Sequence, residues 1–180
     1  MSRAVMYFAD GYEEVEALTV VDILRRGNVE VILAGVNDKT VVSAHQISIN
    51  MDTTIENIDH SLVDMIILPG GAKGVENMLL SEHVLENIKK FHEEKKGIAA
   101  ICAAPSILGR LGILKDRKAT CYPGFEKYLE GCKVVPERVV ISDHIITAQA
   151  VGSAMEFGLA ILETLQGNEI KDIIKKAMYV

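Results

Sequence analysis

The chain has 180 residues, of which 49% are hydrophobic and 24% charged, and its formal net charge is −6. This balance is typical of one soluble globular domain, expected here over residues 1–180. No Lys/Arg-rich run indicates nucleic-acid binding, and no apolar stretch reaches the ~20 residues that cross a bilayer, so we expect neither nucleic acid nor membrane as a partner.

The three cysteines are Cys102, Cys121 and Cys132. Their odd number, without framework spacing or an export signal, predicts free thiols in a reducing, cytoplasmic location. We expect Cys121 and Cys132 to be core or surface thiols.

The first half of the chain alternates strand-like and helix-like segments. Apolar runs at 4–8, 29–36 and 64–69 predict strands, and the last is apolar throughout, as expected of a strand covered on both faces. Residues 10–26 predict a helix that begins at acidic residues and ends at two arginines and a glycine. Residues 40–51 alternate more strongly between apolar and polar residues, which predicts a hairpin or edge strands.

The second half continues in the same manner. Residues 74–97 predict one or two helices, with Ser81 as a cap between them. The strand 97–101 precedes a short helix that Gly112 closes. The expected later elements are a short helix at 123–131, strands in CKVVP, RVVIS and IITAQ, and helices near 152–166 and 168–178. This order predicts an α/β fold, with a mostly parallel sheet and helices on both faces.

Cys102 stands between a predicted strand and a predicted helix, in GIAAICAAP. Strand, sharp turn and helix are the setting of a nucleophile elbow, and Ala103 and Ala104 are small enough to leave room for the turn. A helix that starts just after the cysteine directs N–H groups at the sulfur, which would lower the pKa of the thiol. The alternative is a cysteine that only fills core space.

Glu16 lies inside the apolar arc of the helix 10–26, where it projects between Val20 and Ile23. A carboxylate that faces the core is costly unless it has a partner or a proton. We therefore expect a raised pKa and a role in donating a hydrogen bond to the sulfur or shuttling a proton. The alternative is that this helix end packs loosely and Glu16 reaches solvent.

Gly70 and Gly71 follow the strand 64–69 in LPGGAKG. Adjacent glycines let backbone N–H groups converge on a ligand, as in an oxyanion hole, although a simple tight turn also uses them. The motif is neither a P-loop nor a dinucleotide fingerprint, and no Cys/His cluster has metal-ligand spacing, so we expect no cofactor and no metal. Because parallel strands end at one edge of the sheet, Glu16, these glycines and Cys102 should line one small pocket.

Four segments together resemble the ThiJ/PfpI superfamily, specifically its Parkinson disease protein 7 branch and the bacterial YajL-like members: GYEEVEA, ILPGGAKG, IAAICAAP and VGSAMEFGLAILETLQG. The resemblance runs nearly end to end. It implies a flavodoxin-like three-layer sandwich that forms a homodimer partly through its first helix. It also implies that Cys102 is a peroxide-sensitive cysteine, that protonated Glu16 hydrogen-bonds the sulfur, and that the N–H groups of Gly71 and Ala103 stabilise an oxyanion.

The activities implied by the resemblance are cofactor-free conversion of methylglyoxal to lactate, repair of early glycation adducts, oxidative-stress protection and chaperone-like behaviour. Three hypotheses remain open. In the first, Cys102 is the nucleophile and Glu16 the proton donor and acceptor of an enzyme that acts on small reactive carbonyls or glycated substrates. In the second, oxidation of Cys102 to a sulfinate makes the chain a redox-responsive protective protein. In the third, it is an α/β domain with an inert cysteine.

Several positions depart from the pattern of this family. Ala103 stands where the protease-like branch has a histidine, which argues against proteolysis. Tyr122 replaces a histidine of the animal branch and is expected to line the pocket, although a tyrosine is a poor base near neutral pH. His45 aligns with an arginine near the site, and Val151 stands where a proline is common. These differences bear on which substrate the protein accepts, and they leave the prediction of a Cys102–Glu16 pair unchanged.

Overall fold

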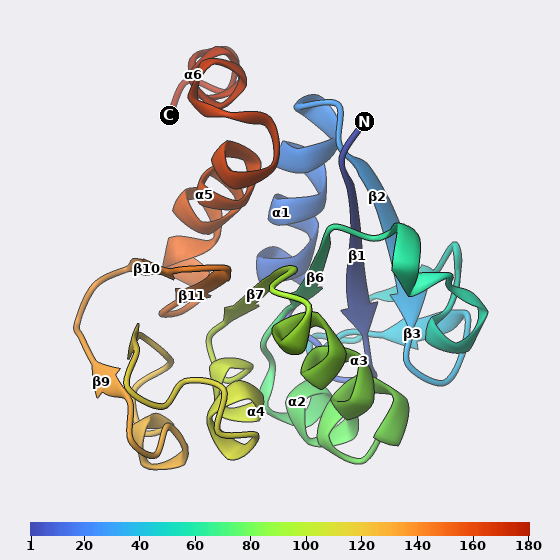
Figure 1. Cartoon of the computed structure of the whole chain (residues 1–180). Helices are drawn as coiled ribbons and strands as arrows, with labels where there is room; N and C mark the ends of the chain where they lie inside the picture. Colours follow the sequence, from blue (N-terminus) through green and yellow to red (C-terminus); the bar gives the residue numbers. More distant parts are fainter.

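A computed structural model describes all 180 residues and confirms a three-layer α/β fold (Figure 1). The central sheet has seven strands in the order β10-β11-β7-β6-β1-β2-β5. All neighbouring strands are parallel except the β10–β11 pair. The strands of the sheet are β1 (Arg3–Phe8), β2 (Glu30–Gly35), β5 (Thr53–Thr54), β6 (Met65–Leu68), β7 (Gly97–Ile101), β10 (Val139–Ser142) and β11 (Ile145–Ala148). The chain leaves β1 first to one side and then to the other, which is the flavodoxin-like arrangement.

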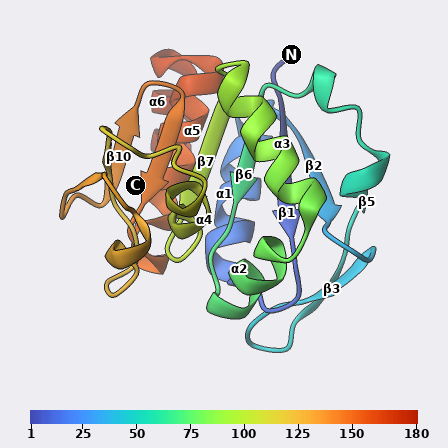
Figure 2. The ribbon, with the colours of Figure 1, turned by 60° about the horizontal axis from the view of Figure 1, so that its bottom comes forward.

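Helices cover both faces of this sheet (Figures 1 and 2). One face carries α1 (Glu14–Arg26) and α5 (Ala154–Gln166), which pack against each other, and α6 (Asn168–Ala177), which packs on α5. The other face carries α2 (Ala72–Leu79), α3 (Glu82–Glu93) and α4 (Pro105–Arg110). Two small two-stranded ladders lie outside the main sheet, β3 (Thr40–Val42) with β4 (Ser48–Asn50) and β8 (Lys118–Ala119) with β9 (Lys133–Val134).

Alternate side chains of the strands enter two separate cores. Along β1, Val5 and Tyr7 belong to a cluster of 26 buried residues on one face, whereas Met6 and Phe8 belong to a cluster of 25 on the other. The two clusters are nearly equal, so both faces of the sheet are fully covered. This explains why the strands are continuous apolar runs in the sequence rather than alternating ones.

Predicted helix boundaries agree with the structure in most places and differ in two. Ser81 caps α3, since its Oγ accepts a hydrogen bond from the N–H of Val84 at 3.4 Å. The first helix begins at Glu14, with Glu13 as its N-cap, and not near residue 10.

The helix predicted at 123–131 is wrong, because only a 3-10 turn forms there, at Glu126–Tyr128. Gly124 has a φ of +94°, and its N–H donates to the Glu126 carboxylate at 2.6 Å, so the backbone turns before a helix can propagate.

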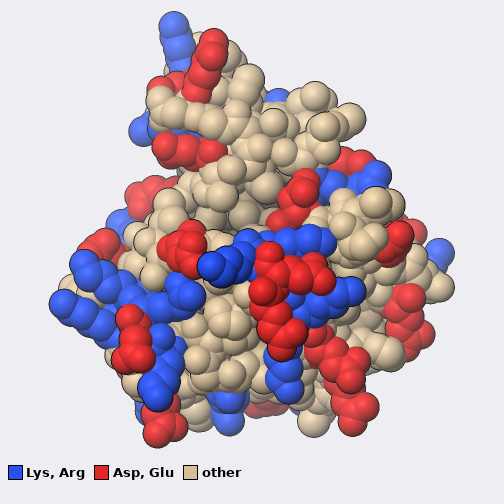
Figure 3. Space-filling model, in the orientation of Figure 1, with Lys and Arg blue, Asp and Glu red and all other residues tan.

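The outer surface carries charges of both signs. Figure 3 shows basic and acidic side chains mixed over one face, while uncharged surface predominates where α6 meets the body of the molecule. None of the helices combines the length and the apolar character needed to cross a membrane.

The packing of α4 leads to a test of the fold. A Cβ on Gly109 would contact the carbonyl oxygen of Tyr128 and lie 2.8 Å from the Cα of Leu129, so two backbone segments touch there. We expect Gly109→Ala to lower the free energy of unfolding by about 1–3 kcal/mol, measured by urea denaturation, because this overpacking cannot be relieved by a side chain alone.

Gly152→Ala is the matched control. A Cβ on Gly152 meets nothing within 4 Å, so the substitution should change stability by less than about 0.5 kcal/mol. Equal stability of the Gly109→Ala variant and the wild type would show that α4 does not need this close approach.

Candidate active site

Cys102 sits on a strained turn directly after β7. Its φ is +65°, a conformation that non-glycine residues rarely adopt. The surrounding strands hold it there: the N–H of Cys102 donates to the carbonyl of Ala148 at 2.9 Å, and the carbonyl of Cys102 accepts from the N–H of Tyr122 at 2.7 Å. The residue is partly exposed. The elbow predicted from the sequence is therefore present.

The glycine pair approaches the sulfur closely. A Cβ on Gly70 would lie 2.6 Å from the Cβ of Cys102 and would also collide with the Glu16 carboxylate, so no larger residue fits. Gly71 has a φ of +87° and packs against the backbone of residues 11–13. The backbone N–H groups of Gly71 and Ala103 lie near the sulfur of Cys102 and favour its ionised form.

Glu16 is 1% exposed and lies against this turn. Its Oε2 accepts a hydrogen bond from the N–H of Gly70 at 2.9 Å, and its carboxyl and the Cys102 sulfur both crowd the position that a Cβ on Gly70 would take. Its Oε1 is buried and has no hydrogen-bond partner. The alternative in which Glu16 reaches solvent is excluded by this burial.

The protonation states of Glu16 and Cys102 depend on each other. Burial is the main reason that the pKa of Glu16 is raised to about 7. Burial, followed by the negative charge of Glu16, raises the pKa of Cys102 to about 12. The N–H groups of Gly71 and Ala103 lower this pKa, but by less. The predicted lowering of the thiol pKa by the helix N-terminus is therefore wrong, because burial and the Glu16 charge together outweigh the nearby N–H groups. Once Glu16 is protonated, its charge is gone and its O–H can donate to the sulfur, which favours the thiolate.

The histidines all lie elsewhere. His60 pairs with the Tyr7 hydroxyl at 2.6 Å, and His92 pairs with His144 at 3.0 Å. His83 lies 3.6 Å from Glu56, and His45 lies 2.7 Å from Glu14. No histidine hydrogen-bonds Cys102, so the chain does not contain the Cys-His pair of a thiol hydrolase.

The remaining predicted site residues are only loosely gathered. The side chain of Tyr122 is 46% exposed, and only its backbone binds the cysteine residue. The structure has four surface hollows, and neither Cys102 nor Glu16 lines any of them. One chain alone therefore does not enclose the small pocket predicted around these two residues. Cys121 and Cys132 are free thiols, buried and partly buried respectively.

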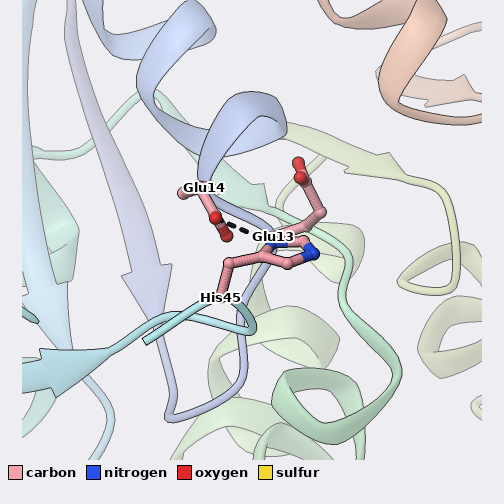
Figure 4. A group of neighbouring side chains, drawn as sticks. All are labelled: Glu13, Glu14 and His45. Carbon is pink, nitrogen blue, oxygen red and sulfur yellow. Dashed lines mark hydrogen bonds and ion pairs between the residues drawn. The ribbon is translucent and has the colours of Figure 1, made fainter. Parts of the chain in front are cut away.

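Sequence reasoning missed two carboxylates beside this site. Glu13 caps α1 by accepting the N–H of Glu16 at 2.7 Å, and its own N–H donates to the carbonyl of Gly70 at 3.1 Å. Glu14 is buried and pairs with His45 (Figure 4). A carboxylate three residues before a buried helical position is a capping signal that could have identified Glu13. The burial of Glu14 depends on a distant loop.

An open α/β sheet with a strained cysteine elbow and a buried carboxylic acid at its carboxyl edge defines a class of reactive-cysteine proteins. The model of the DJ-1/PfpI family matches residues 2–164, and the chain belongs to that family.

Curated relatives are identical to this chain at about a third of the aligned residues. Protein DJ-1 homolog B of Arabidopsis thaliana is 34% identical over 96% of this chain, and homolog A is 34% identical over 89%. The chain spans only 40% and 42% of the lengths of those two proteins. The glutathione-independent glyoxalase DJR-1.2 of Caenorhabditis elegans is 34% identical over 98% of this chain and 95% of its own length.

Solved structures agree with the fold over its whole length. Drosophila melanogaster DJ-1beta superposes with a TM-score of 0.96 at 33% identity, covering 100% of this chain and 99% of that one. Oxidised Toxoplasma gondii DJ-1 superposes at 0.95 with 31% identity, covering 99% and 98%. A DJ-1 superfamily protein from Salmonella typhimurium also reaches 0.95, at 28% identity and the same coverage.

The opposition between the Glu16 charge and the thiolate can be measured. Above the Glu16 pKa of about 7, we expect Glu16→Gln to accelerate alkylation of Cys102 by iodoacetamide, because the neutral amide removes that charge. Each unit by which the thiol pKa falls gives about tenfold more thiolate. Peptide-resolved mass spectrometry separates Cys102 from the other two thiols.

Below that pH, the wild type and the variant should react at similar rates, because Glu16 is then neutral in the wild type too. Glu76→Gln, on the exposed surface of α2, is the control and should follow the wild type. An equal or lower rate for Glu16→Gln at high pH would mean that Glu16 does not oppose the thiolate.

Proposed function

We propose that this protein is a cofactor-independent cysteine enzyme that acts on small reactive carbonyls, converting methylglyoxal to lactate or removing early glycation adducts. The observation that carries the proposal is the buried Glu16 carboxyl beside the Cys102 sulfur, with the N–H groups of Gly71 and Ala103 near the same atom. The glyoxalase name of the Caenorhabditis elegans relative supports this class of reaction.

The reaction would begin with the Glu16 carboxyl protonated and Cys102 as a thiolate. Sγ adds to the aldehyde carbon of methylglyoxal, a C–S bond forms, and the resulting alkoxide takes the proton of Glu16. The product is a hemithioacetal. The N–H groups of Gly71 and Ala103 are the nearest donors for the developing negative charge.

Glu16, now a carboxylate, would accept the proton of the former aldehyde carbon. Reprotonation of the neighbouring carbon converts the enediol into a lactoyl thioester, so the first carbon is oxidised and the second reduced. Water then cleaves the C–S bond and releases lactate and the thiol. Methylglyoxal and one water thus give lactate without an external electron carrier, and Glu16 acts at each proton transfer.

A glycation adduct would enter the same sequence. The sulfur displaces the amine or thiol from the hemiaminal or hemithioacetal carbon, and the leaving group departs with the proton of Glu16. The enzyme then holds the same hemithioacetal on Cys102, and lactate formation follows as before.

Lactate production from methylglyoxal tests the proposal. We expect Cys102→Ser to abolish it and Glu16→Gln to lower kcat by about 10²–10⁴, the usual range for general acid–base catalysis. Cys132→Ser, a thiol remote from Glu16, is the matched control and should retain activity. Equal rates in all variants would overturn the proposal.

A second function, redox sensing, is supported by one comparison, since Toxoplasma gondii DJ-1 is known in an oxidised form. The Cys102 thiolate would attack a peroxide oxygen and the O–O bond would break. One oxygen would stay on the sulfur as a sulfenate, and the other would leave as water. A second peroxide would yield the sulfinate. Protonated Glu16 and the N–H groups of Gly71 and Ala103 could each donate to the sulfinate oxygens.

Peroxide titration with intact-protein and peptide mass spectrometry tests this second function. Cys102 should gain two oxygens before Cys121 or Cys132 is modified. Of the three thiols, it is the one beside Glu16 and backbone N–H groups that can stabilise a sulfinate. Preferential oxidation of Cys121 or Cys132 while Cys102 stays reduced would rule it out.

We also propose that two copies of the chain form a homodimer through α1. The outer surface of this helix carries Val15, which is 50% exposed, and Cys102 is partly exposed on a single chain. A second copy would cover apolar surface that is otherwise solvated.

Light scattering coupled to size exclusion tests this assembly. Val15→Glu should shift the protein toward the monomer, because it places a charge in the contact. Ile141→Glu, on the edge strand β10 and 56% exposed, is the matched control. A wild-type protein that is monomeric at all concentrations would contradict the proposal.

A further inference from the structure

Three donor side chains gather beside the reactive site without a role in the proposed chemistry. Glu13 and Glu14 stand at the start of α1, and His45 lies in the loop between β3 and β4. One nitrogen or oxygen atom from each lies within 4.8 Å of the others. Figure 4 shows the Glu14 carboxylate directed at the His45 ring, while the carboxylate of the neighbouring Glu13 is turned away from this pair.

Glu14 is the unusual member of this cluster. Its side chain is only 10% exposed, and its Oε1 lies 2.7 Å from His45 Nδ1. Its Oε2 is buried and has no hydrogen-bond partner. A buried carboxylate oxygen without a partner is costly, so a cation that binds it would be favoured. The side chain of His45 is 71% exposed, which leaves the cluster open to an ion from solvent.

Glu13 can contribute without losing its structural role. Its Oε2 accepts the N–H of Glu16, which leaves Oε1 available. Metal–ligand distances of about 2.1 Å require donor atoms to lie closer than 4.8 Å. The Glu13 side chain is partly exposed, and ion binding would require its carboxylate to turn toward Glu14 and His45.

We propose that Glu13, Glu14 and His45 bind a divalent first-row transition cation such as Zn²⁺. An imidazole nitrogen with two carboxylates suits Zn²⁺, Co²⁺ or Mn²⁺ better than Mg²⁺ or Ca²⁺, which prefer oxygen alone. The two carboxylates balance the charge of the ion, and the ion replaces the direct contact between His45 and Glu14. Three protein ligands leave one coordination position open to water or an anion.

Calorimetric titration of the whole protein with Zn²⁺ tests this site. We expect one equivalent to bind, and we expect Glu14→Gln and His45→Ala each to weaken binding by about tenfold or more. His83→Ala is the matched control, because His83 is also an exposed imidazole near a single carboxylate, 3.6 Å from Glu56. Its affinity should equal that of the wild type.

Cys102→Ser separates this site from metal capture by the thiol and should retain the bound equivalent. Co²⁺ absorption provides a second readout, with ligand-field bands but no sulfur-to-cobalt charge-transfer band. Loss of binding in Cys102→Ser but not in His45→Ala would overturn the proposal. Equal affinities in all variants would mean an adventitious ion only. If Glu14→Gln fails to fold, the exposed His45→Ala decides the outcome.

Discussion

The contact between a buried carboxyl and a sulfur, Glu16 against Cys102, is the constraint on which the rest of the site depends. A carboxyl that is 1% exposed needs partners or a proton, and here the N–H of Gly70 binds one oxygen while the other has no hydrogen-bond partner, beside the Cys102 thiol. The same contact requires glycine at position 70, because a Cβ there would collide with both groups. Three separate turns of the chain must therefore keep their positions to a fraction of an ångström.

The topology of the sheet brings these turns together. The strands β1, β6 and β7 are neighbours, and each runs parallel to the next, so their carboxyl ends meet at one edge. Backbone hydrogen bonds then join the turns: Glu13 donates to Gly70, and Cys102 is held between Ala148 and Tyr122. The strain at Cys102 is sustained because packed neighbours on both sides determine its conformation.

Much of this architecture could be predicted from the sequence, because the signals are local. Continuous apolar runs predict strands that helices cover on both faces, and the position of Glu16 on its helix predicts that its side chain is buried. The sign of the Cys102 pKa shift could not be predicted, since it depends on how burial and the Glu16 charge compare with two N–H groups. The burial of Glu14 was also missed, because the loop that carries its partner His45 comes from a hairpin 31 positions away. The open elbow likewise depends on the surroundings of the cysteine.

One turn of α1 therefore places three carboxyl groups in three environments. Glu13 caps the helix, Glu14 faces the imidazole of His45, and Glu16 faces the sulfur of Cys102. Successive helical residues are rotated by about 100°, so Glu14 and Glu16 project to nearly opposite sides of the helix axis. A cation held by Glu14 and His45 would thus occupy a different side of α1 from the sulfur. The same short segment can support both sites because its helical geometry keeps their ligands apart.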